Sequence, residues 1–117
     1  MASGTIKNRE WRLLWTNSTP TSSFASQTVQ LGGTFTELKI VFVLNNGTSI
    51  RGAAFFMDAD GETWRIYSNN SNFQYARGMS CAGSALAILD ATKYSTYGNS
   101  NATTDNSGII PLRIYGR

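Results

Sequence analysis

The side chains best suited to chemistry in this chain are its carboxylates, because the sequence contains no histidine. Histidine is the commonest general base at neutral pH, the commonest metal ligand and the base of Ser–His and Cys–His pairs. Among the seven acidic residues, only Asp58, Asp60 and Glu62 cluster. A glycosidase needs two carboxylates that face one cleft, whereas these three lie in a predicted hairpin turn. The sequence therefore predicts a protein that is not an enzyme, with no catalytic residues and no cofactor.

The same acidic segment shares some features with a calcium-binding loop. An EF-hand loop carries glycine at its sixth position and a bidentate glutamate at its twelfth. Counted from Asp58, those positions hold Thr63 and Asn69, so the pattern does not match. Asp and Gly are also the residues that tight turns favour. We interpret residues 58–62 as a turn and predict no metal site.

Aromatic side chains provide the main sign of ligand binding. A sugar-stacking platform could include Trp11, Trp15, Trp64, Tyr67 and Tyr75. Large aromatic side chains also fill the cores of small β domains, and this interpretation is favoured for Trp15 and Trp64. Tyr67 shares a strand face with Arg65, so it is the better candidate for a surface contact. The candidate ligand-binding residues are Tyr67, Arg65 and Tyr75, and a small carbohydrate-binding module is one hypothesis.

The charge pattern argues against a nucleic acid partner. The net charge is +3, but the ten basic residues are spread along the chain and only Lys7, Arg9 and Arg12 cluster. A nucleic-acid-binding protein usually concentrates its charge on one face. An OB-type binder of single-stranded nucleic acid, supported by the charge and the aromatic residues, is therefore the least favoured hypothesis.

The length of 117 residues predicts one folded domain over residues 1–117. The lone Cys81 has no intrachain disulfide partner. No segment approaches the roughly 20 apolar residues of a membrane span, and the N-terminus lacks the apolar stretch of a signal peptide. We therefore expect no membrane contact.

Alternating apolar residues predict strands rather than helices. In residues 35–44, Leu38, Ile40, Phe42 and Leu44 fall on one face. Asn46-Gly47 is a strong hairpin signal, and as a two-residue loop it places Ile40 opposite Ala53. Residues 49–57 and 62–67 are the next strands, so that residues 35–67 would form a three-strand meander with one packed side.

Further strands are expected at residues 11–16, 28–31, 73–80 and 108–115. Residues 85–92 suit either a helix or a strand, and we favour a strand because the neighbouring segments are strands. Residues 94–107 are predicted to be a long loop, and Pro111 indicates an edge strand or a bulge because it has no N–H. The predicted fold is an all-β, single-domain antiparallel sandwich or flattened barrel of about seven or eight strands.

The two ends of the chain carry motifs that point to a family. The segments are ASGTIK (residues 2–7), LLWTNSTPTSSFASQTVQL (residues 13–31), Ile110-Pro111 and Ile114-Tyr115-Gly116. This pattern resembles small minor tail or hypothetical proteins encoded among the tail genes of tailed phages and prophages of Gram-positive bacteria. The resemblance implies a β-rich protein made in the bacterial host cytoplasm and located in the virion. It implies a structural or host-receptor-binding role and carries over no functional residue.

The resemblance and the surface together predict self-association. Tail appendages of this kind are commonly trimers, so we expect a homotrimer that contacts other tail proteins, with a host surface glycan as a further candidate partner. The second strand face carries Val41, Val43, Ile50 and Phe56, which we expect to lie partly in the interface. An unprotected terminal edge strand would add to this tendency. We also expect the terminal strand, residues 108–115, to lie beside residues 11–16 and so to close the sheet.

Overall fold

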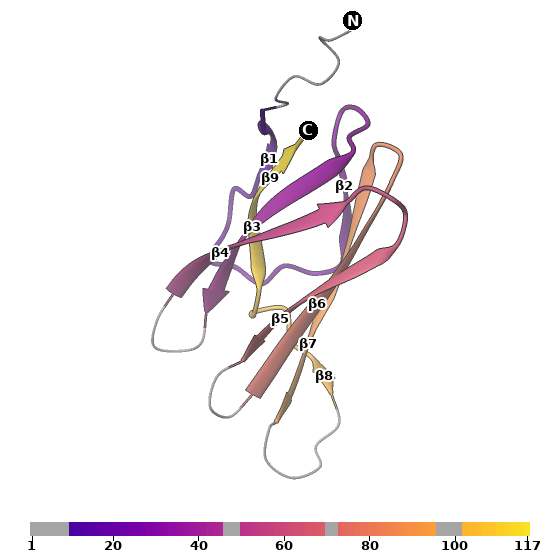
Figure 1. Ribbon diagram of the computed structural model, residues 1–117. Coiled ribbons are helices and arrows are strands. Elements are labelled where there is room, and N and C mark those ends of the chain that lie inside the picture. Colours follow the sequence, from indigo (N-terminus) through magenta and orange to yellow (C-terminus); the bar gives the residue numbers. More distant parts are fainter. Residues whose placement is uncertain (1–9, 46–49, 70–72, 96–101) are drawn as a thin grey trace, which may run out of the picture.

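The computed structural model describes residues 10–45, 50–69, 73–95 and 102–117 (Figure 1). Within these residues the chain forms nine strands and no helix. The strands are β1 (Arg12–Thr16), β2 (Gln27–Gln30), β3 (Glu37–Asn45), β4 (Ile50–Asp58), β5 (Thr63–Asn69), β6 (Phe73–Ala82), β7 (Ala85–Ser95), β8 (Thr103–Thr104) and β9 (Ile110–Gly116). The predicted all-β fold is confirmed. The strand beyond the eight expected is β8, which lies within the predicted long loop.

The strands form two antiparallel sheets that enclose one core. Sheet A has the order β1-β9-β3-β4, and sheet B has the order β2-β7-β6-β5 with β8 paired to β7 (Figure 1). Side chains from both sheets meet between them: the fully buried residues include Leu38, Ile40 and Phe42 from β3, Met79 from β6 and Ile88 from β7. This is the sandwich-like arrangement in which each strand alternates between core-facing and outward residues.

The β3–β4 hairpin has the predicted inner face but a different register. Ile40 pairs with Phe55, and Phe42 pairs with Ala53, so the predicted pairing of Ile40 with Ala53 is wrong by two residues. The pairing of Asn45 with Ile50 leaves four residues in the connection, and the predicted Asn46-Gly47 turn lies outside the described residues. A shift of two residues keeps each side chain on its own face, which is why the face assignment holds.

The predicted three-strand meander is wrong. β5 pairs with β6 in sheet B, and the chain crosses from sheet A to sheet B after β4. Ile66 is still a buried member of the core and Trp64 packs against that core, although both lie in sheet B. The segment between β4 and β5, which crosses from one sheet to the other, contains Asp60. Its Oδ1 accepts hydrogen bonds from the Glu62 amide at 3.0 Å and from Trp64 Nε1 at 3.2 Å. Asp60 therefore acts as a turn-forming residue.

The terminal strand β9 pairs on both sides, with β1 and with β3. The prediction that it lies beside residues 11–16 is confirmed. The prediction that it is an edge strand is wrong, because β1 and β4 flank sheet A in the described part of the chain. Pro111 lies beside a register shift in the β3–β9 pairing, as expected for a bulge. The amide Nδ2 of buried Asn17 donates to the Pro111 carbonyl at 2.9 Å.

The segment of residues 85–92, for which we favour a strand, is part of β7. It forms a tight hairpin with β6 through Gly83-Ser84, where Gly83 has φ +61. Only glycine adopts such a conformation without strain. Among the described residues this is the longest hairpin, and it carries most of sheet B.

Candidate interaction surface

The three residues predicted to bind a ligand do not share one surface. Arg65 and Tyr67 point outward from β5, and the Tyr67 side chain is 56% exposed. Tyr75 points inward from β6 and packs against the core. Its ring lies so close to Gly108 that a Cβ added there would overlap it. The structure therefore leaves Arg65 and Tyr67 as neighbours on sheet B and removes Tyr75 from them.

The outer face of sheet A brings together residues that are far apart in the sequence. Tyr115 of β9 pairs with Leu13 of β1 on one side and with Lys39 of β3 on the other. Lys39 in turn pairs with Phe56 of β4. These four residues form a row that crosses all four strands, which we call the transverse row. Its two ends are open to solvent, since Leu13 is 52% and Phe56 is 57% exposed.

Cations lie over aromatic rings along this row. Lys39 Nζ lies 4.5 Å from the centroid of Tyr115 and 5.5 Å from that of Trp11. The guanidinium of Arg117 lies 4.2 Å from the Trp11 centroid. Trp11 also contacts Phe56, with centroids 5.8 Å apart and a tilt of 52°. Each such contact is worth about 0.5–1 kcal/mol at an exposed site, so together they order the face.

Arg117 is held beside the transverse row, next to Glu37 of β3. The Nε of Arg117 lies 2.8 Å from Glu37 Oε1, and its carbonyl accepts from the Thr36 and Glu37 amides. These contacts hold Arg117 against the start of β3. They also place one basic and one acidic side chain, Arg117 and Glu37, beside the row.

The second strand face, which carries Val41, Val43, Ile50 and Phe56, is only partly exposed. Phe56 is exposed, Val41 is half-buried, and Val43 packs against the core. The side chain of Ile50 lies outside the described residues. Val41 pairs with Arg113 of β9, whose Nε is buried without a hydrogen-bond partner. The outer face of sheet A is thus mixed aromatic, apolar and basic.

Sequence reasoning missed Arg77, which is fully buried on β6. Its guanidinium donates to the carbonyls of Ile109 at 2.7 Å, Leu89 at 2.7 Å and Gly108 at 3.4 Å, and lies 5.6 Å from the Phe24 ring centroid. Burial lowers the pKa of Arg77 to about 10, against the opposing attraction of Asp90. The signal was present in the sequence: a basic residue occupies a position on the apolar face of Phe73, Tyr75 and Met79.

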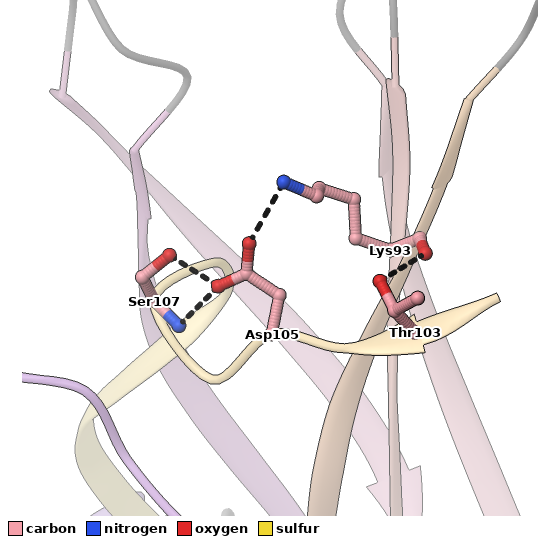
Figure 2. Close-up of polar contacts among 4 residues, drawn as sticks. All are labelled: Lys93, Thr103, Asp105 and Ser107. Carbon is pink, nitrogen blue, oxygen red and sulfur yellow. Dashed lines mark hydrogen bonds and ion pairs between the residues drawn. The ribbon is translucent and has the colours of Figure 1, made fainter.

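A second polar cluster joins the segment before β9 to sheet B. Asp105 accepts from Ser107 and pairs with Lys93 at 3.1 Å, while Thr103 donates to the Lys93 carbonyl (Figure 2). Partial burial raises the pKa of Asp105, but the hydrogen bonds from Ser107 and Lys93 outweigh it and the pKa lies below its ordinary value. These contacts tie the segment before β9 to β7, which is a structural role.

The described residues offer little for small-molecule or metal chemistry. They enclose no pocket, and they contain no group of three or more carboxylate and thiol side chains placed to hold a metal ion. No helix in the described part of the chain has the length and apolar character to cross a membrane.

Comparison with known proteins adds no family. No protein-family model matches the sequence, and no curated protein matches it. The resemblance to phage tail proteins thus depends on the terminal motifs. Of these, residues 13–31 and 110–116 form β1, β2, the loop between them and β9, and residues 2–7 lie outside the described residues.

Proposed function

We propose that this protein is a non-enzymatic structural and receptor-binding module of phage or prophage tails, and that its protein contacts use the outer face of sheet A. The terminal motifs support the tail context. The observation that carries the choice of face is the transverse row, which ends in two half-exposed apolar side chains, Leu13 and Phe56. Aromatic residues and arginine are enriched in protein interfaces, and both are gathered here.

The cation–aromatic contacts favour a protein partner over a sugar on this face. Sugar stacking needs an open ring face, but Lys39 and Arg117 already lie over the rings of Trp11 and Tyr115. The apolar groups that are open, Leu13 and Phe56, lie at opposite ends of the row. Such separated contacts suit an extended protein surface better than a single sugar ring.

Tail incorporation tests this proposal. We would tag the chain in a phage or prophage whose tail genes encode it, and detect it in purified particles by immunoblot. We expect Phe56→Asp to be absent from the particles. Tyr67→Asp is the matched control, because Tyr67 is 56% exposed on the opposite sheet against 57% for Phe56. A gene outside any tail gene cluster, or equal incorporation of both variants, would overturn the proposal.

A second function, glycan binding, is supported by the outer face of sheet B. Tyr67 and Tyr94 are 56% and 38% exposed there, and Arg65 is also exposed. This is the arrangement of stacking ring and polar neighbour that a host surface glycan would use. Glycan-array binding that Tyr67→Ala abolishes and Phe56→Ala leaves unchanged would establish it, whereas the absence of any glycan signal would remove it.

A further inference from the structure

We propose that the open edge of β4 binds an extended strand of another protein, which adds to sheet A beside β4. In the described part of the chain β4 pairs only with β3, so its other side has no neighbour in the sheet. The inference rests on the proposed function, because β4 also carries Phe56 at the end of the transverse row. It goes further by naming the partner's chemistry, which is a polypeptide in the extended conformation, recognised first through its backbone.

The hydrogen bonds of β3 show which backbone groups of β4 lie at the open edge. Glu37 and Arg117 exchange two backbone hydrogen bonds of 3.1 Å each, so the amide and carbonyl of Glu37 point toward the end of β9. Successive residues of an antiparallel strand point these groups to opposite sides, so Leu38 and every second residue after it point toward β4. Their partners on β4 are the odd-numbered residues Met57, Phe55 and Ala53. The even-numbered residues of β4 therefore direct their amides and carbonyls away from β3.

These backbone groups are accessible. Gly52, Ala54 and Phe56 are exposed, and no backbone hydrogen bond from another described segment reaches them. The amide of Ala59 donates to the Thr36 carbonyl at 2.9 Å, which agrees with odd-numbered residues facing β3. The edge thus offers N–H and C=O groups repeated about every 7 Å, the spacing of alternate residues in a strand. This pattern is complementary to the backbone of another strand.

β4 lacks the features that protect edge strands from pairing. Proteins protect an edge by making it short, by placing charge or proline in it, or by a bulge. Each other edge strand among the described residues has one of these features. β1 has a register shift between Leu13 and Trp15, β2 and β8 have four and two residues, and β5 carries Arg65. By contrast, β4 has nine residues in unbroken register with β3, and residues 52–57 (GAAFFM) include neither charge nor proline.

The side chains beside the open edge indicate which strand fits. On the outer face of sheet A, an added strand extends the transverse row beyond Phe56, which is 57% exposed. Aromatic residues pair well across strands with β-branched or aromatic residues. A Cβ at Gly52 would meet nothing within 4 Å, so that position leaves room for a large side chain of the partner. The partner is thus an extended segment with alternating β-branched or aromatic residues and no charge opposite residues 52–56.

Strand addition is tested with the full chain, isotope-labelled for NMR, and the blocked peptide acetyl-Lys-Thr-Val-Thr-Val-Thr-Val-Lys-amide. In the protein alone, we expect the amides of Gly52, Ala54 and Phe56 to exchange with solvent quickly. The amides of Phe55 and Met57, which face β3, should exchange slowly. Added peptide should shift the first three amides and slow their exchange.

Two variants at one position separate backbone pairing from side-chain contact. Ala54→Pro removes a donor from the open edge and leaves the pairing with β3 in place, as proline does on edge strands. We expect it to weaken peptide binding about tenfold, because one hydrogen bond is lost. Ala54→Val keeps the N–H and should bind as the parent does. The same peptide N-methylated at its central residues should not bind the parent, and this control requires no variant to fold.

No peptide binding by the parent, shifts that lie away from β4, or binding of the N-methylated peptide would overturn the inference. Equal binding by Ala54→Pro and Ala54→Val, both folded by circular dichroism, would also overturn it. Protection of Gly52, Ala54 and Phe56 that rises with protein concentration alone would show a second copy at the edge and overturn the choice of partner. Because the test uses purified protein, peptide binding by a chain that is absent from tail particles would overturn the proposed function alone.

Discussion

The Nε of Arg77 donates a hydrogen bond of 2.7 Å to the carbonyl of Ile109, a residue whose backbone has φ +44. A β-branched residue in this left-handed region is strained, and such strain persists only where the surroundings hold it in place. Both side chains are fully buried. The segment that leads into β9 is therefore held by a cation from sheet B.

Replacing Arg77 should destabilise the fold strongly. Arg77→Met leaves the buried carbonyls of Ile109 and Gly108 without their donors, and each unsatisfied group costs about 1–3 kcal/mol. We expect the free energy of unfolding to fall by about 3 kcal/mol in chemical denaturation. Arg65→Met, an exposed arginine on the same sheet, should change it by less than about 0.5 kcal/mol. Equal midpoints for the two variants would show that Arg77 does not hold this segment.

Asp90 should make stability depend on acid pH. Hydrogen bonds from the Ser26 amide and then the Asn106 side chain lower the pKa of Asp90 below 3.8. The unfolded chain then binds more protons through this window, so the stabilisation is present above about pH 3.8 and is lost as the pH falls through the folded pKa. We expect Asp90→Asn to be less stable than the parent at neutral pH and to converge with it at low pH. A stability difference that stays constant across the titration would contradict this.

Phe42 should be essential to the core. It is fully buried on β3, and Phe→Ala substitutions in cores cost about 3–5 kcal/mol. Domains of this size have total stabilities of about 5–15 kcal/mol. Phe42→Ala should therefore lower the melting temperature sharply and leave little folded protein at physiological temperature. A melting temperature equal to that of the parent would mean that the inner face of β3 is misassigned.

Gly116 should tolerate no side chain. A Cβ at this position would lie 2.8 Å from Leu14 Cδ1 and from the Phe35 ring. We expect Gly116→Ala to cost about 1–3 kcal/mol, the usual cost of overpacking, in thermal denaturation. Gly52→Ala is the matched control, because a Cβ there meets nothing within 4 Å. If both variants melt like the parent, the terminal strand is packed less tightly than the structure indicates.

Alternation of apolar residues was enough to predict most strands and the core-facing side of β3, because the period of two is a local property. The sheet to which β5 belongs was not visible, since alternation says which face is apolar and not which strand is its neighbour. The transverse row was hidden for the same reason: Leu13, Lys39 and Tyr115 meet only through pairing between the two ends of the chain and β3. The position of Arg77 on an apolar strand face indicates its burial, but its partners are backbone carbonyls, which no sequence pattern displays.

The mass of the protein in solution tests most directly whether the outer face of sheet A is its contact surface. Sedimentation equilibrium would compare the parent with Phe56→Asp and Tyr67→Asp over micromolar to submillimolar concentrations. We predict that the parent and Tyr67→Asp associate beyond the monomer mass of 12.8 kDa and that Phe56→Asp stays at that mass. A parent that remains at 12.8 kDa throughout, or a Phe56→Asp variant that associates as the parent does, would contradict this assignment of the face.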